Sequence, residues 1–153
     1  MVELNTFAAA PVMLSLCFAA TLLVGLVVSV WLSSRQIRHV AQHRATVPAA
    51  FAQTIGLSAH QKAADYTIAK ARLGLVEVAV GVVVLLGWTL LGGLDILNRT
   101  LLTQVEGGMW QQLALLGSFA LISGAIDLPL SWYQTFVLED RFGFNKTTPK
   151  LWL

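Results

Sequence analysis

Residues 4–34 contain no charged side chain, and this stretch restricts the possible folds more than any other feature of the chain. A helix needs roughly 20 apolar residues to cross the hydrocarbon core of a bilayer, so a helix over about residues 7–32 can span one. Two further apolar blocks follow, at about residues 73–94 and 109–130. Charged residues make up only 12% of the chain, against about 25% in ordinary soluble domains. The sequence therefore predicts an all-α integral membrane protein with three transmembrane helices.

Basic residues are concentrated between the first two apolar blocks. They are Arg35, Arg38, Arg44, Lys62, Lys70 and Arg72. The connection between the second and third blocks has only Arg99. Lysine and arginine stay on the cytoplasmic side of a membrane, so we expect loop 35–72 and tail 139–153 in the cytoplasm and the N-terminus outside. A formal net charge of +2 is too small to indicate nucleic acid as a partner.

Part of the 35–72 loop has the pattern of a helix. Residues 58–61 read SAHQ, which has the form of a capping box that starts a helix. No proline follows until after Gly92 and Gly93. We therefore expect one long helix that begins in the cytoplasm and continues through the second apolar block, with its charged residues solvated.

Two segments carry a specific resemblance. Residues 128–148 read LPLSWYQTFVLEDRFGFNKTT, where the third apolar block gives way to aromatic, acidic and basic residues. Upstream, Val47 and Pro48 are followed by Phe51, and residues 62–72 read KAADYTIAKAR. These segments, in this order around three membrane blocks, resemble the type I CAAX prenyl proteases, a family of integral-membrane zinc metallopeptidases. The stretch GWTLLGG that ends at Gly93 looks like the bacterial members.

The resemblance implies a zinc-dependent enzyme, yet the family's zinc motif is missing from this sequence. That motif is His-Glu-x-x-His on a helix, in which the histidines hold zinc and the glutamate acts as general base. The nearest approach is His39 and His43, which are correctly spaced but have Val40 in place of the glutamate. A solvated basic segment explains them better than a metal site does, and His60 is isolated. We therefore expect no catalytic residue, metal ligand or cofactor in this chain, which should be inactive alone.

In the family, the zinc motif follows two further membrane helices, which would place it beyond residue 153. We therefore expect the chain to be the N-terminal membrane domain, truncated before the catalytic zinc domain. The resemblance implies a bacterial inner-membrane location and, for the complete enzyme, zinc and hydrolysis of peptide substrates. A non-enzymatic membrane scaffold or regulatory subunit is the alternative. A transporter fragment is disfavoured because no broken-helix pair or internal repeat is visible.

Two acids lie within or at the edge of apolar blocks, Glu77 and Asp127. An ionisable group at the centre of a bilayer costs at least about 2.5 kcal/mol. The acids could sit at the interface, helped by Arg72 or Arg141. Alternatively they could face water, because the resemblance implies a helical enclosure around an aqueous chamber. Both explanations remain open at this stage.

The aromatic residues on the predicted cytoplasmic side suggest a contact surface, since purely solvated loops have little use for them. We expect the loop and the tail to bind the catalytic domain. The residues expected to take part are Tyr66, Glu139, Asp140, Phe142 and Phe144.

Overall fold

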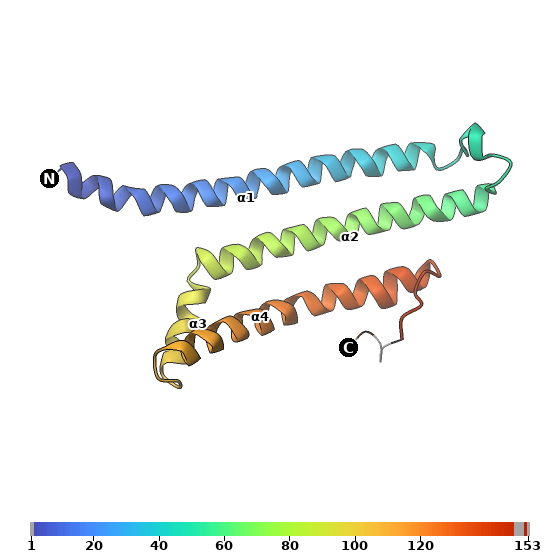
Figure 1. The fold of residues 1–153 in the computed structure, drawn as a ribbon. Helices are drawn as coiled ribbons and strands as arrows, with labels where there is room; N and C mark the ends of the chain where they lie inside the picture. Colours follow the sequence, from blue (N-terminus) through green and yellow to red (C-terminus); the bar gives the residue numbers. More distant parts are fainter. Residues whose placement is uncertain (1, 149–151, 153) are drawn as a thin grey trace. The chain divides into compact units, whose positions relative to one another are not determined.

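The computed structural model describes residues 2–148 and 152, with side chains from residue 10 onward. Its long helices are α1 (Val2–His43), α2 (Leu57–Thr89) and α4 (Met109–Trp132), with the shorter α3 (Gly93–Leu102) between α2 and α4 (Figure 1). A 3-10 turn, η1 (Ala49–Phe51), precedes α2. A π-helix, η2 (Tyr133–Glu139), continues α4. All regular structure in this part of the chain is helical, as predicted.

Three helices are long and apolar enough to cross a membrane: Ala10–His43, Leu57–Thr89 and Met109–Glu139. Their large apolar side chains are mostly exposed; Leu14, for example, is 72% exposed and Leu121 is 76% exposed. Exposing so much apolar surface to water is unfavourable, whereas exposing it to lipid is not, because lipid tails are as apolar as leucine itself. The predicted fold class, an integral membrane protein with three transmembrane helices, is confirmed.

The chain divides into two compact units. Unit 1 consists of Met1–Val28 and Val78–Ala125, and unit 2 of Ser29–Glu77 and Ile126–Leu153. Unit 1 thus holds most of the apolar helical sequence together with α3. Unit 2 holds the end of α1, the first part of α2, the end of α4 and η2.

In unit 1, two glycines end α2 and begin α3. Gly92 has φ +81°, a left-handed conformation that favours glycine. A Cβ on Gly93 would lie 2.8 Å from the carbonyl oxygen of Gly87, so no larger residue fits there without a backbone shift. As a result α2 stops at Thr89, and Gly93 and Leu94, which the apolar pattern assigns to the second span, belong to α3 instead.

Helix α3 was not anticipated from the sequence, and it contacts α4. The side-chain amide of Gln111 donates a hydrogen bond to the side-chain oxygen of Asn98, and Gln111 is only 7% exposed. Trp88 of α2 packs edge-on against Phe119 of α4, with ring centroids 5.2 Å apart. Within unit 1, a polar contact therefore joins α3 to α4, and an aromatic contact joins α2 to α4.

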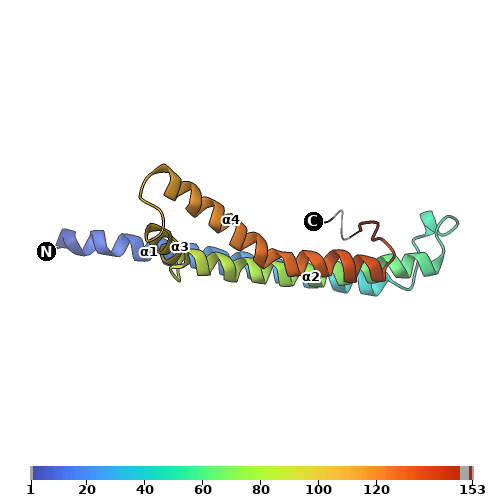
Figure 2. The same ribbon diagram turned by 90° about the horizontal axis from the view of Figure 1, so that it is seen from below.

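In unit 2, the first part of α2 runs beside the end of α4 and η2 (Figures 1 and 2). Helix α1 continues to His43, so residues 35–43 of the expected loop are helical. Helix α2 begins at Leu57 and runs without interruption to Thr89. The expectation of one helix that extends well before its apolar block is therefore confirmed.

The turn between α1 and α2 is closed by an ion pair. The Arg44 guanidinium donates from Nε and Nη2 to the two carboxylate oxygens of Asp65, at 2.6 and 2.8 Å. Hydrogen bonding to this carboxylate raises the pKa of Arg44 above its ordinary value. The bidentate geometry fixes where the chain leaves α1 relative to α2.

Candidate functional site in unit 2

A glycine-centred turn ends the helix that follows η2. Gly143 has φ +71°, its N–H donates to the carbonyl of Asp140, and the Phe144 N–H donates to the carbonyl of Glu139, both at 2.9 Å. This pair of bonds is the Schellman motif, in which a left-handed residue terminates a helix. The turn places Phe142 and Phe144 on either side of a residue that only glycine fills without strain.

Both phenylalanines contact Tyr66 of α2. The Tyr66 ring centroid lies 5.5 Å from that of Phe142 and 4.8 Å from that of Phe144, in edge-on and tilted geometries. Such arrangements are the favoured ones for aromatic pairs. Tyr66 and Phe142 are half-buried, whereas Phe144 is 50% exposed. We call Tyr66, Phe142 and Phe144 the aromatic cluster.

Cationic groups surround this cluster. Lys62 Nζ lies 6.0 Å from the Phe144 ring centroid, and Lys70 Nζ lies 5.8 Å from that of Tyr66. Arg141 Cζ lies 5.9 Å from the Phe142 ring centroid. Cations at these distances are attracted to aromatic faces. The surface at this end of unit 2 is thus aromatic at its centre and positively charged around it.

The structure separates the five residues expected to form a contact surface into two groups. Tyr66, Phe142 and Phe144 come together. Glu139 and Asp140 contribute their backbone carbonyls to the Gly143 turn. Within the described residues, neither carboxylate takes part in an ion pair. A glycine directly after a predicted helix is the sequence signal that could have located this turn.

Glu77 and Asp127 line the same hollow, of about 210 Å³, together with Leu130, Ser131 and Gln134. Glu77 is half-buried and Asp127 is exposed. The structure therefore brings the two acids to one hollow.

The arginines considered as partners for these acids lie elsewhere. Arg72 and Arg141 line a different hollow, of about 370 Å³, with Asp65 and Phe142.

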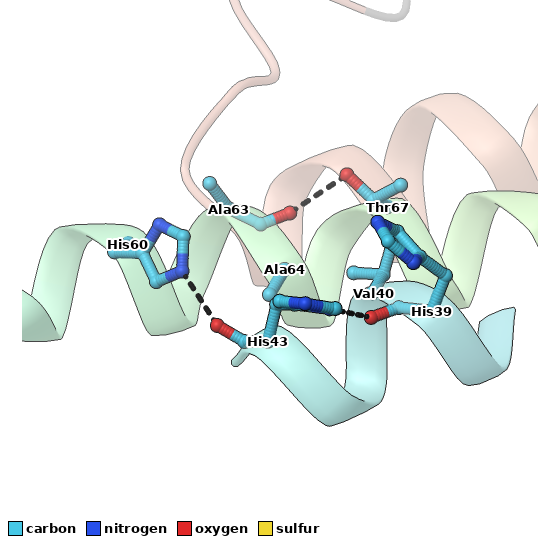
Figure 3. Close-up of a pocket in the computed structure, with 7 residues that line it drawn as sticks. All are labelled: His39, Val40, His43, His60, Ala63, Ala64 and Thr67. Atoms are coloured by element: carbon cyan, nitrogen blue, oxygen red, sulfur yellow. Dashed lines mark hydrogen bonds between the residues drawn. The ribbon is translucent and has the colours of Figure 1, made fainter. Parts of the chain in front are cut away.

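Three histidines also line one hollow, of about 260 Å³, between the end of α1 and the start of α2 (Figure 3). His60 Nε2 donates to the carbonyl of His43 at 3.0 Å, and His43 Nδ1 donates to the carbonyl of His39 at 2.8 Å. The His39 and His43 rings lie with their centroids 4.3 Å apart and their planes tilted by 39°. Nothing in the sequence indicated that His60 would join the other two.

The zinc that the sequence resemblance implies does not fit these residues. In the part of the chain that the structure describes, no three His, Cys, Asp or Glu side chains are arranged to hold a metal ion. Two of the histidine rings are already bonded to backbone carbonyls at the end of α1. The site that unit 2 builds is therefore a surface of aromatic rings, cations and acids.

These features define a helical integral membrane protein whose distinctive chemistry is concentrated in unit 2. Residues 36–153 match the family described as "CAAX prenyl protease N-terminal, five membrane helices". The chain belongs to this family, whose members are zinc metalloproteases. The family resemblance inferred from the sequence is confirmed.

Two individual proteins are similar to the chain. The curated "CAAX prenyl protease 1" of Saccharomyces cerevisiae is 54% identical over 43 residues, which cover 28% of this chain and 10% of the yeast protein. The crystal structure of S. mikatae Ste24p superposes with a TM-score of 0.81 at 27% identity, covering 90% of this chain and 33% of that one. The chain thus spans about a third of the length of the solved structure that it matches.

Proposed function

We propose that this chain forms the N-terminal membrane scaffold of a zinc metalloendopeptidase that hydrolyses peptide bonds at the membrane. The observation that carries the proposal is the superposition on Ste24p over 90% of the chain. The chain's own role is to supply part of a helical wall and a contact surface, while the zinc-binding residues belong to a catalytic domain of the same enzyme. The substrates would be membrane-associated peptides or proteins.

A graft tests this role. Residues 1–153 would replace the corresponding segment of a complete family enzyme, and zinc content and peptide cleavage would be measured for the graft and for the chain alone. We expect a graft that binds zinc and cleaves peptide, and a chain that does neither. One tightly held zinc per isolated chain would contradict the proposal and direct attention to His39, His43 and His60.

We propose that Glu77 and Asp127 face water inside the complete enzyme. Support comes from their shared hollow, which also contains the polar side chains of Ser131 and Gln134. The arginines that could have neutralised them at the interface line a different hollow.

The test is labelling of Glu77→Cys and Asp127→Cys by a charged thiol reagent in membranes, in a Cys17→Ser background. Val76→Cys is the control, because Val76 is a neighbouring apolar residue that is 49% exposed on α2. We expect the thiols introduced in place of Glu77 and Asp127 to react faster than the thiol of the control variant. Equal, slow labelling at all three positions would rule the aqueous location out.

We propose that the aromatic cluster binds the catalytic domain. Phe144 supports this role, because half of its surface is exposed although its ring is held by Tyr66 and by the Gly143 turn. In the proposal, Glu139 and Asp140 present their carboxylates to basic groups of that domain.

Phe144→Ala in a complete enzyme that carries this segment should lower turnover and melting temperature. In the isolated chain the same change should have a much smaller effect, because the proposed partner is absent. Equal effects in both would mean that Phe144 serves only the local fold.

The chain is an integral membrane protein, and we propose a bacterial inner-membrane location with the N-terminus outside and the C-terminus cytoplasmic. The charge distribution supports this orientation, and the resemblance of residues 87–93 to bacterial members supports the location. Single cysteines at Gln53 and Thr103, in the Cys17→Ser background, should label from opposite sides of the membrane. Labelling of the Gln53 site from outside would reverse the orientation.

A further inference from the structure

One face of α1 carries two arginines, Arg35 and Arg38, that the features described above do not use, and His39 of the histidine hollow lies on the same face. Arg35, Arg38, His39 and Gln42 are spaced so that they share one side of the helix, and together they line an open hollow of about 330 Å³. All four residues are exposed. We call these four residues the basic face of α1.

Among the described residues, no acidic side chain forms an ion pair with this face. The ion pairs formed by the described residues are Arg44–Asp65 and Arg99–Asp95. The described residues that line the hollow include no acid. Arg38 donates from Nε to the carbonyl of Ser34 at 3.3 Å, and within the described residues its two terminal nitrogens make no hydrogen bond. An anion is therefore the natural ligand for this face.

The basic face lies on α1 directly after the uncharged, apolar part of the helix. Residues 4–34 are uncharged, and Arg35 is the first charged residue after them. The Arg35 guanidinium lies 5.0 Å from the ring centroid of Trp31. Tryptophan is enriched at membrane interfaces. Trp31 and Leu32 are 54% and 53% exposed. Apolar surface thus adjoins the cations one helical turn away.

From this juxtaposition we propose that the basic face of α1 binds the phosphate headgroup of an anionic phospholipid, with the lipid chains against Trp31 and Leu32. A soluble anion would use the arginines but would leave the two exposed apolar side chains without a role. An acidic protein partner would not require an uncharged, membrane-spanning stretch directly beside the cations. Arginine suits the headgroup because its planar guanidinium donates two parallel hydrogen bonds to phosphate.

Native mass spectrometry of the purified chain in neutral detergent tests the proposal, with phosphatidylglycerol, phosphatidylcholine or inorganic phosphate added. We expect tight binding of phosphatidylglycerol only. A juxtamembrane cation contributes about 1 kcal/mol to attraction by anionic lipid. Arg35→Gln or Arg38→Gln should therefore weaken phosphatidylglycerol binding about fivefold, and the double variant on the order of 25-fold.

The matched control is Arg99→Gln, which removes the same charge from α3, where Arg99 is paired with Asp95 at 2.9 Å. This variant should bind phosphatidylglycerol as the unchanged chain does. The double variant Arg35→Lys/Arg38→Lys keeps both charges and should retain most of the binding.

Three results would overturn the proposal. The first is unchanged phosphatidylglycerol binding in the double glutamine variant, which would indicate that the basic face serves a protein partner. The second is equal loss in the Arg99→Gln control, which would indicate a general effect of net charge. The third is binding of inorganic phosphate as tightly as phosphatidylglycerol, which would indicate a soluble anion.

Discussion

Unit 1 and unit 2 use the same kind of helix but are stabilised by different interactions. The buried apolar residues that the structure describes are Ala64, Leu73 and Leu138, and all three belong to unit 2. The described buried residue of unit 1 is polar, Gln111. Lipid removes the hydrophobic driving force between helices, so helices that face lipid need polar or close-packed contacts to associate. Unit 2, in contrast, can gain from burying apolar surface against itself.

Charge follows the same division. Every lysine and arginine except Arg99 lies in unit 2, as do the ion pair between Arg44 and Asp65 and the aromatic cluster. The residues available for recognition are therefore concentrated in one unit, while the other provides apolar helices. This contrast leads to four predictions on stability, in order of decreasing effect.

The largest effect is expected for Tyr66→Ala, which removes the shared partner of Phe142 and Phe144. Two aromatic pairs contribute about 0.5–1.5 kcal/mol each beyond their buried area. Including the lost burial, unfolding of unit 2 should become easier by about 2–4 kcal/mol, measured by thermal or denaturant unfolding in detergent.

Tyr66→Phe is the matched control and should be nearly neutral, because it keeps the ring. A large effect of Tyr66→Phe would show that the hydroxyl, and not the aromatic packing, stabilises unit 2.

Gly143→Ala should have the second largest effect, about 1–2 kcal/mol, because alanine is strained at φ +71°. Space is not the obstacle, since an added Cβ would meet only the flexible end of Lys62, at 3.6 Å. Gly74→Ala, at a helical position with nothing within 4 Å, is the control and should leave stability unchanged or raise it. If both variants melted alike, the left-handed turn would not matter.

In unit 1, Gln111→Leu should cost roughly 0.6 kcal/mol, the average for a hydrogen bond between membrane helices. The loss should fall on the contact between α3 and α4, because Asn98 would lose its partner. A double-mutant cycle with Asn98→Ala measures this interaction directly. Additive effects in that cycle would show that the two side chains do not stabilise each other.

The smallest effect is expected for Asp65→Asn, which removes one charge of the ion pair that closes the turn between α1 and α2. The Arg44 and Asp65 side chains are 43% and 41% exposed, so solvent screens their attraction. The destabilisation should shrink further at high salt. A loss that did not depend on salt would point to the bidentate hydrogen bonds, and not to charge, as the source of stability.

Much of the fold could be predicted because it depends on local properties of the sequence. The length of an apolar block sets whether a helix can span a bilayer, and this identified all three long helices. The absence of proline between residues 58 and 93 likewise predicted the continuous α2. Helix ends were predicted less well, because α2 stops at a pair of glycines inside an apolar stretch that hydropathy alone does not divide.

The candidate site depends on contacts between residues far apart in the chain, and only the tertiary structure decided them. The sequence singled out Tyr66, Phe142 and Phe144 as one surface, but it could not say that the phenylalanines pack on the tyrosine while the carbonyls of Glu139 and Asp140 hold the turn.

The histidines show the same limit. His39 and His43 share a helix face by their spacing alone, whereas His60 joins them only because the α1–α2 turn brings it to the carbonyl that ends α1. Hydropathy and spacing act along the chain and can be read from it. The pairing of distant side chains depends on how the helices pack, and a local sequence pattern does not determine that packing.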